Sequence, residues 1–445
     1  MRLLSNVAPL RCRVRLARLY STGTSGVVNV MGKDYTRDHL TNITPTIISK
    51  LSRKLYNQPG HPLSTLRALI ESHFADYAHL SSVSPIVSPA QNFDGLSFPA
   101  DHPGRSPTDS YYINKHTMLR THTSAHEVEV FARGTARYLL TADVYRRDEI
   151  DASHYPVFHQ MEGARVVSAD STGMAELTAD NARLRAELAR SPIVIDDIPH
   201  FDARTNPHQP EHDPAHAVAL AENLKLSLNG LLLKLFGGRA NLGGDAEGGE
   251  PLRVRWVETT FPWTAPSFEA EVLFRGEWLE ILGCGVVRQK TLENANVPDK
   301  LAWAFGLGLE RIAMILYSIP DIRLFWSDDP RFAAQFAQGE ISAFRPYSRY
   351  PACYKDVSFW RPDVAGGTRA MHENDFCDLV RDVAGDLVED VTLTDEFEHP
   401  TTKRQSVCYR INYRSMDRSL SNDETNALHA KVVSELKNQF GAEIR

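Results

Sequence analysis

The densest group of side chains that could do chemistry lies between Tyr145 and Gly163, in the stretch YRRDEIDASHYPVFHQMEG. Apparent strands precede and end this stretch, which predicts an antiparallel hairpin with a long polar loop. Successive side chains of a strand point to opposite faces, so Phe158, Gln160 and Glu162 share one face. Arg146 ends the first strand and confronts them if the two faces coincide. Such a surface complements a ligand with an anion, a flat ring and an ammonium group.

A solvated hairpin and a metal site are the alternatives for this stretch. Charged residues are common on exposed hairpins. A metal ion would require His154, His159 and a carboxylate to converge, but His159 lies on the opposite strand face from Glu162. A second group of histidines lies among prolines at irregular spacing, which favours a surface insertion over a metal site: His200, His208, His212 and His216.

The composition predicts a two-domain globular protein. A chain of 445 residues is too long for one core, and 42% hydrophobic with 24% charged residues is ordinary globular composition. No run of eighteen apolar residues occurs, so no membrane-spanning segment is expected. The net charge of −7 means that any RNA binding must depend on local basic patches. Five scattered cysteines form no CxxC pair, which argues against a disulfide framework or a cysteine zinc site.

The first twenty residues differ from the rest of the chain. They contain five arginines, and the first acidic residue is Asp34. An arginine-rich start without acids is typical of a mitochondrial transit peptide, so residues 1–20 are expected to direct the protein to the mitochondrial matrix. A basic tail that binds nucleic acid is the alternative.

Hydrophobic spacing predicts the elements that position these residues. Helical patterns extend over residues 37–74, where HPLST at residues 61–65 divides two helices, over 124–138 and, with an interruption, over 173–235. Strands are expected at 254–263, 268–274 and 277–283. The segment AWAFGLGLERIAMILY begins in glycines and continues as a helix that buries Leu309, Ile312, Ala313 and Leu316, with Arg311 on the opposite side.

A separate domain is predicted after a linker at residues 339–350. Residues 351–445 have the order strand, helix, strand, strand, helix. In the third strand, Val407, Tyr409, Ile411 and Tyr413 alternate with polar residues, which indicates a half-buried sheet. This order is that of a split βαβ, ferredoxin-like module.

The ordered set of motifs resembles a known family. A strand-ending arginine with FHQxE downstream, followed by GLGLER opening a helix, resembles motifs two and three of class II aminoacyl-tRNA synthetases. Together with NFDGLSFPADHPGR, LRTHTSAH, FPWTAPSFE and EILGCGVV, these motifs resemble the phenylalanine–tRNA ligases, in their single-chain mitochondrial form. The resemblance implies an α+β fold. An antiparallel catalytic sheet flanked by helices would occupy residues 21–338, and a ferredoxin-like βαββαβ anticodon-binding domain residues 351–445.

The resemblance also implies roles for individual residues. Arg146 and Arg311 would be catalytic, on the α- and γ-phosphates of ATP. The implied ATP site comprises Arg146, Ser153, His154, Tyr155, Phe158, Glu280, Gly306, Gly308 and Arg311. The implied phenylalanine site comprises His122, Ser124, Ala125, His126, Glu127, Gln160, Met161, Glu162, Phe261, Trp263, Ala304 and Phe305.

Two of these positions depart from the family pattern. Several relatives have glutamine at the position of Glu127, so this chain would add a charge near the substrate. The family's F-P-F segment is Phe261-Pro262-Trp263 here, and strand alternation would place both rings on one face, as an edge-to-face cage for a benzyl group.

The implied activity is a two-step acyl transfer. L-Phenylalanine would react with ATP to give an adenylate, and tRNA(Phe) would then take the acyl group on its terminal 2′-hydroxyl. Mg²⁺ would be carried mainly by ATP, with no separate protein metal site, and the chain would act as a monomer. The basic residues expected to contact tRNA are Lys403, Arg404, Arg410, Arg414 and Arg418. The alternatives are a class II ligase for another amino acid, and an inactive synthetase-like RNA-binding protein.

Overall fold

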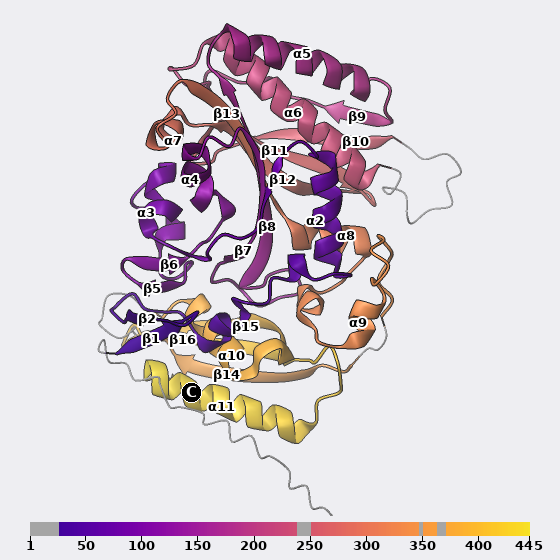
Figure 1. The fold of residues 1–445 in the computed structure, drawn as a ribbon. Coiled ribbons are helices and arrows are strands. Elements are labelled where there is room, and N and C mark those ends of the chain that lie inside the picture. The colour runs from indigo at the N-terminus through magenta and orange to yellow at the C-terminus, as the bar shows by residue number, and fades with distance from the viewer. Residues whose placement is uncertain (1–25, 238–250, 347–349, 363–370) are drawn as a thin grey trace, which may run out of the picture.

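The computed structural model describes residues 26–237, 251–346, 350–362 and 371–445 (Figure 1). The expected transit peptide at 1–20 and residues 347–349 of the expected linker lie outside the described residues. Of the helices in the described part of the chain, none is both long and apolar enough to cross a membrane.

A mixed sheet of eight strands forms the centre of the described catalytic region, in the order β3-β7-β8-β13-β12-β11-β10-β9. The neighbouring pairs are antiparallel except at the two edges, where β3 pairs with β7 and β9 with β10 in parallel. The predicted antiparallel core is therefore confirmed for the middle of the sheet. The strands are Ala78–Leu80, Arg137–Tyr145, Val157–Ser168, Lys300–Gly308, Glu277–Val287, Thr264–Phe274, Leu252–Thr259 and Ile193–Asp196.

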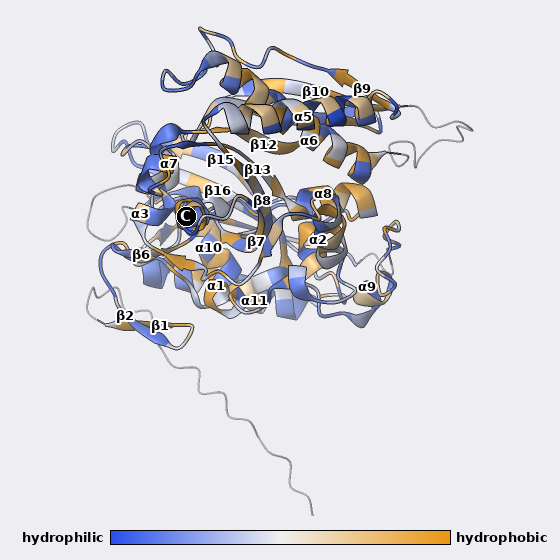
Figure 2. Ribbon diagram, turned by 45° about the horizontal axis from the view of Figure 1, so that its top comes forward, coloured by the Kyte–Doolittle hydropathy of each residue, from blue (hydrophilic) through white to orange (hydrophobic). Residues whose placement is uncertain are grey.

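Helices flank this sheet (Figure 1). The longest, α6, buries leucines along its length and bonds to the sheet through Asn223 and Asn229, whose Oδ1 atoms accept the indole N–H groups of Trp303 and Trp256. Apolar residues extend along α8, as Figure 2 shows in orange. The helices are α1 Pro45–Lys50, α2 Pro62–His73, α5 Ser171–Leu188, α6 Pro214–Phe236 and α8 Leu309–Tyr317.

The stripe predicted for α8 is confirmed. Leu309, Ile312, Ala313 and Leu316 are buried in the main core, and Arg311 is exposed. The helix begins directly after Gly308, the last residue of β13, so the glycines of GLGLER belong to a strand and the remainder to a helix.

Several predicted boundaries were wrong. The pattern at 37–74 forms two helices, as the break near His61 indicated, but α1 begins only at Pro45 and α2 begins at Pro62. The helix expected at 124–138 is a 3₁₀ turn at Thr123–His126 followed by α4 at Glu127–Ala132. Gly134 adopts a left-handed φ of 76° just after α4, and β7 begins at Arg137.

Smaller elements cover the edges of the catalytic region. The hairpin of β1 and β2 was not predicted, because each strand is only four residues long. A second small sheet has the order β4-β6-β5. These elements are β1 Val27–Val30, β2 Lys33–Thr36, β4 Ile86–Val87, β5 Tyr112–Asn114, β6 Thr117–Leu119, α3 Pro89–Asn92, α7 Gln289–Asn294 and α9 Pro330–Ala334.

The histidine- and proline-rich segment after β9 is largely exposed, as predicted for a surface insertion, but three buried polar side chains anchor it to β11, β12 and α7. Gln209 donates to the carbonyl oxygens of Ala265 and Val287 at 2.9 and 3.0 Å, and Asn206 donates to that of Ser267 at 2.8 Å. His212 bonds through Nε2 to Gln289. The segment therefore holds the start of β11 and the end of β12 in place, next to Phe261-Pro262-Trp263.

The C-terminal region has its own hydrophobic core and the predicted ferredoxin-like order. Its sheet runs β15-β16-β14-β17, and α10 and α11 pack against one face. Val407, Tyr409, Ile411 and Tyr413 are buried as predicted. The elements are β14 Cys353–Trp360, α10 Glu373–Ala384, β15 Val388–Glu398, β16 Gln405–Tyr413, α11 Asn422–Phe440 and β17 Glu443–Ile444.

Candidate active site

A cavity of about 790 Å³ lies on the central sheet and gathers most of the residues singled out in the sequence. These lining residues are His122, Ser124, Arg146, Ser153, His154, Tyr155, Phe158, Gln160, Glu162, Phe261, Trp263, Glu280, Ala304, Phe305, Gly306, Gly308 and Arg311. Among the described residues, four others from the predicted phenylalanine site do not line it: Ala125, His126, Glu127 and Met161.

The hairpin of β7 and β8 confirms the prediction from strand alternation. Val144 pairs with Phe158, and Leu140 pairs with Glu162. The guanidinium carbon of Arg146 lies 5.3 Å from the centre of the Phe158 ring, and its Nε donates to the carbonyl oxygen of Thr121 at 2.9 Å. Four further N–H groups remain on the fork of Arg146, which suits it to an anion that lies against a flat ring.

Glu162 forms the buried end of this face. Its carboxylate accepts hydrogen bonds from the hydroxyls of Ser124, of Tyr138 at 3.0 Å and of Thr123 at 3.4 Å. Burial raises the pKa of Glu162 to about 7, although these hydroxyls oppose the shift. A buried carboxylate of this kind is a suitable partner for an ammonium group, because the positive charge would stabilise the ionised form of Glu162.

Glu127 does not supply the charge expected from the sequence. It is fully buried in α4, and among the described residues neither carboxylate oxygen has a hydrogen-bond partner. Burial, and then the nearby charge of Glu162, raises its pKa well above the ordinary value of 4.5. The side chain is therefore held as a neutral acid, which resembles a glutamine amide in shape and charge. His126 is also buried and accepts from the guanidinium of Arg120.

Aromatic rings form the apolar wall of the cavity. Phe98 stacks on His122 at 5.5 Å and on Trp263 at 5.1 Å, and Trp263 lies 5.6 Å from Phe261 at an angle of 27°. Burial lowers the pKa of His122 to about 3, so this ring is neutral. The strand predicted for the FPW segment was wrong, since it is a turn between β10 and β11, but both rings still line the cavity.

Glycines allow the rings and a ligand to approach the sheet. A Cβ on Gly283 would come within 2.6 Å of the Phe261 ring, so a residue without a side chain is required at this position of β12, where the ring packs against the strand. Apart from the glycine and its chain neighbours, no described atom lies within 4 Å of a Cβ built on Gly306 or Gly308, because these residues face the open cavity. Gly306 pairs with Glu162, which places this bare strand directly beside the carboxylate.

Charged residues surround the other end of the cavity. Arg311 Nη1 lies 3.4 Å from Glu280 Oε2, and both side chains are largely exposed. His154 Nδ1 lies 2.6 Å from Asp151 Oδ2 in the hairpin loop, defined here as residues 146–156 between β7 and β8. Burial lowers the pKa of His154, but the hydrogen bond to Asp151 and the charges of the neighbouring acids together raise it above its ordinary value. This end therefore presents exposed arginines and a histidine to an anion.

Some lining residues gave no signal in the sequence. Thr123 donates its backbone N–H to Gln160 Oε1 at 3.3 Å, and Cys284, Asp148 and Ile322 also line the cavity. His159 faces away, where Glu310 accepts its N–H groups. Among the described residues, no group of three or more metal-ligating side chains is close enough to hold a metal ion.

The fold and the site together define a class of enzyme. Residues 47–195 and 185–336 match the family model "tRNA synthetases class II core domain (F)", and residues 348–445 match the model "Ferredoxin-fold anticodon binding domain". These matches cover the central sheet with its cavity and the C-terminal sheet, respectively. The chain thus contains a class II aminoacyl-tRNA synthetase core joined to an anticodon-binding fold.

Full-length relatives narrow the class. The chain is 42% identical over 463 aligned positions to the mitochondrial phenylalanine–tRNA ligase of Saccharomyces cerevisiae, covering 98% of this chain and 99% of the yeast protein. It is 43% identical to the mitochondrial enzyme of Mus musculus, over 94% of this chain and 89% of the mouse protein. For the chloroplastic/mitochondrial enzyme of Arabidopsis thaliana the identity is 41%, over 98% and 91%. The chain belongs to the family of mitochondrial phenylalanine–tRNA ligases.

Two glycine substitutions are expected to affect the two substrates differently, one the KM for phenylalanine and the other the KM for ATP. In Gly283→Ala the new methyl group displaces the Phe261 ring, so the KM for phenylalanine should rise about tenfold, as a misshapen apolar pocket does. In Gly308→Ala the methyl group enters open cavity space on the side of Gln160 and Phe158, toward the nucleotide end, so the KM for ATP should rise instead. Steady-state pyrophosphate exchange measures both constants, and equal changes in the two variants would contradict this division.

The neutral state of Glu127 predicts a pH-dependent effect on stability. The native protein holds the proton while the unfolded chain releases it above about pH 4.5, so this group destabilises the wild type as pH rises. Glu127→Gln removes that loss. As pH rises, the free energy of unfolding of Glu127→Gln should therefore increase relative to that of the wild type by up to about 1.4 kcal/mol per pH unit. Denaturant unfolding between pH 5 and 8 measures the difference, and a gap that does not change with pH would refute the neutral acid.

Proposed function

We propose that this protein attaches phenylalanine to mitochondrial tRNA(Phe) through a phenylalanyl-adenylate, using ATP and Mg²⁺. The observation that carries the proposal is the single cavity in which Arg146 lies over Phe158 while the buried Glu162 and an aromatic wall lie further in. An anion with a flat ring fits the first part, and an amino acid with an aromatic side chain fits the second.

In the first step the phenylalanine carboxylate attacks the α-phosphorus of ATP and pyrophosphate leaves. Arg146 neutralises charge at the α-phosphate, and Arg311 neutralises charge at the γ-phosphate. Glu162 and Gln160 hold the amino group, so the carboxylate is the free end of the substrate. Catalysis of this kind depends on positioning and on charge, and no protein nucleophile is required.

In the second step the 2′-hydroxyl of the terminal adenosine of tRNA attacks the adenylate carbonyl and AMP leaves. The residues around the cavity fit Mg²⁺ carried on ATP phosphates, because Glu280 supplies one exposed carboxylate beside Arg311 and Mg²⁺ is usually held by one or two carboxylates plus phosphate oxygens. When bound, the ion would neutralise phosphate charge.

Three further expectations belong to this proposal. The protein acts as a monomer in the mitochondrial matrix after loss of residues 1–20. Residues 21–338 form the catalytic domain, 339–350 the linker and 351–445 the anticodon-binding domain. Homologues named as mitochondrial support the compartment, and the separate hydrophobic core supports the division of the chain.

Pyrophosphate exchange with each of the twenty amino acids tests the reaction. Phenylalanine should support exchange, and tyrosine should do so with a kcat/KM only about a hundredfold lower, since an apolar pocket discriminates weakly against one added hydroxyl. Exchange with a different amino acid alone would indicate another class II ligase. No exchange with any amino acid would indicate an inactive RNA-binding relative.

The basic residues proposed to contact tRNA are all paired with acids. The pairs are Lys403–Glu398, Arg404–Glu443, Arg410–Asp356, Arg414–Glu389 and Arg418–Glu424. Arg414 also donates to the carbonyl oxygen of Tyr350 at 2.8 Å and is partly buried. Charge alone therefore does not show which of these five residues contact tRNA.

Aromatic residues single out two of the five. Lys403 and Arg404 line a cavity of about 490 Å³ together with Trp360. The guanidinium of Arg404 lies 4.9 Å from the Trp360 ring, and Phe397, 38% exposed, lies 6.4 Å from that ring on the sheet. Half-exposed rings beside cations are the usual platform for single-stranded RNA bases. We place the main anticodon-loop contact here.

Trp360→Ala should weaken tRNA binding by about 1–3 kcal/mol, the usual value of one stacked base. Arg410→Ala is the matched control on the same sheet, because Arg410 is exposed and paired with Asp356 away from the rings. Filter binding measures affinity, and exchange without tRNA checks that the catalytic site is intact. A larger loss in the control than in Trp360→Ala would place the contact elsewhere.

A further inference from the structure

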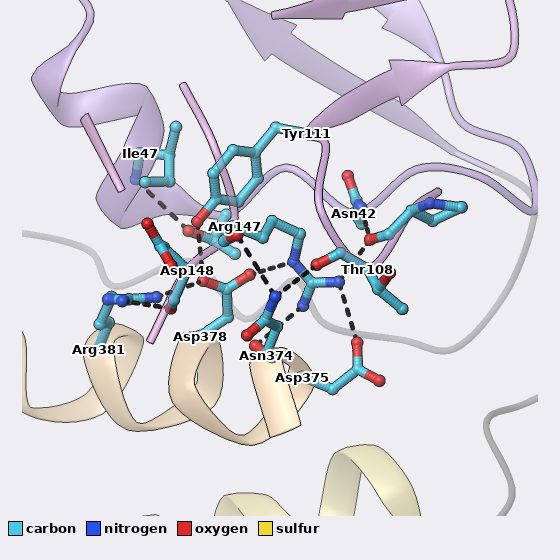
Figure 3. Close-up of polar contacts among 12 residues, drawn as sticks. Asn42, Ile47, Thr108, Tyr111, Arg147, Asp148, Asn374, Asp375, Asp378 and Arg381 are labelled. Carbon is cyan, nitrogen blue, oxygen red and sulfur yellow. Dashed lines mark hydrogen bonds and ion pairs between the residues drawn. The ribbon is translucent and has the colours of Figure 1, made fainter. Parts of the chain in front are cut away.

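The hairpin loop, residues 146–156, lies between two different surfaces. Arg146, Asp148, Ser153, His154 and Tyr155 line the nucleotide end of the cavity. The other side of the loop lies against the C-terminal domain, chiefly against α10 (Figure 3). A loop of this length has no internal secondary structure to fix it, so its shape depends on what it contacts.

The main contact is the buried guanidinium of Arg147. Its Nε donates to Asp378 Oδ2 at 2.5 Å, and its Nη1 donates to Asp375 Oδ1 at 3.0 Å. Asp375 and Asp378 are three residues apart and therefore share one face of α10. Asn374 donates in return to the carbonyl oxygens of Arg147 and Thr108. Figure 3 shows the Arg147 side chain directed at the helix, between these carboxylates.

Further contacts hold the loop backbone. Arg381 on α10 donates to the carbonyl oxygens of Asp148 and Glu149, and the N–H of Val391 in β15 donates to that of Ile150 at 3.0 Å. The Ile150 side chain is buried in the C-terminal core. Near the end of the loop, the hydroxyl of Tyr155 donates to Asp386 at 2.6 Å. The residues that face the cavity are thus interleaved with residues tied to the C-terminal domain.

Buried charges make this arrangement specific. Arg147, Asp375 and Asp378 are each less than 10% exposed, so loss of one partner leaves an uncompensated charge out of water. Tyr111 also donates to Asp378 Oδ1, at 2.7 Å, which fixes the orientation of that carboxylate. Arg146 directly precedes Arg147 in the chain, so a displacement of the backbone at Arg147 also displaces Arg146.

We propose that α10 of the C-terminal domain positions the ATP site: Asp375 and Asp378 hold Arg147, and through it the hairpin loop, in the shape that binds the nucleotide. This inference rests on the proposed ATP site. The C-terminal domain then contributes to adenylate formation, a reaction in which tRNA takes no part. Asp375, Asp378 and Arg147 are positioning residues, since none of them lines the cavity within the described part of the chain.

The test uses the full chain in phenylalanine-dependent pyrophosphate exchange without tRNA. Asp378→Asn, and Asp375→Asn with Asp378→Asn, should raise the KM for ATP about tenfold or more and leave the KM for phenylalanine within about twofold. Arg147→Met should have the same effect, and adding Asp378→Asn to it should cause no further rise, because both changes remove one interaction.

Asp417→Asn is the matched control. Asp417 accepts a hydrogen bond from Ser327 at 2.8 Å across the same domain boundary, away from the hairpin loop. Its KM values should match the wild type. An unchanged KM for ATP in Asp378→Asn, or a parallel rise in both KM values, would overturn the proposal, as would an equal effect of Asp417→Asn.

Failure of this inference is distinguishable from failure of the proposed function. Wild-type protein without exchange would sink the function, and the same variants would then be compared for binding of ATP itself by calorimetry. If the double variant does not fold, as judged by its melting temperature, Arg147→Lys replaces it. Lysine retains the charge but lacks the planar fork, so it should weaken ATP binding with little loss of stability.

Discussion

The register of β8 between β7 and β13 is the constraint on which the site depends. A strand paired on both sides cannot slip by one residue without turning every side chain to the other face. This pairing places Phe158, Gln160 and Glu162 on the cavity side, and it sets Gly308 and Gly306 directly beside Gln160 and Glu162. Polar side chains on one strand therefore face a bare backbone on the next, and that combination leaves room for a ligand against the sheet.

The features that followed from local spacing were predictable. The two-residue period of β8 and the apolar stripe of α8 are properties of short segments, so the sequence alone indicated them. Motif resemblance supplied the proposed roles of residues such as Arg311, which no periodicity could assign. The extent of the helix after Ser124 was not predictable, because Gly134 and the pairing of β7 shorten it and strand pairing is a tertiary effect.

The features that depend on distant parts of the chain gave no local signal. Glu127 looked like an added charge, yet its burial beside Glu162 makes it neutral. Arg147 looked like a second copy of Arg146, although its partner Asp375 lies 228 residues further on. The acids that pair with the basic residues of the C-terminal sheet likewise come from neighbouring strands and helices. In each case the sequence shows a charge, and only the fold shows what surrounds it.

The position of Asp375 and Asp378 near the end of the chain has a consequence for the order of assembly. The central sheet can form as soon as residue 308 is available, since its last strand ends there. The buried guanidinium of Arg147 has no carboxylate until α10 exists, and burial of an unpaired charge is strongly unfavourable. The central sheet can thus fold before the hairpin loop adopts its final conformation. A chain whose synthesis has not reached α10 would then have the sheet but not the ordered nucleotide site. Under the proposal that α10 positions the ATP site, adenylate would form only on chains that already carry the C-terminal domain.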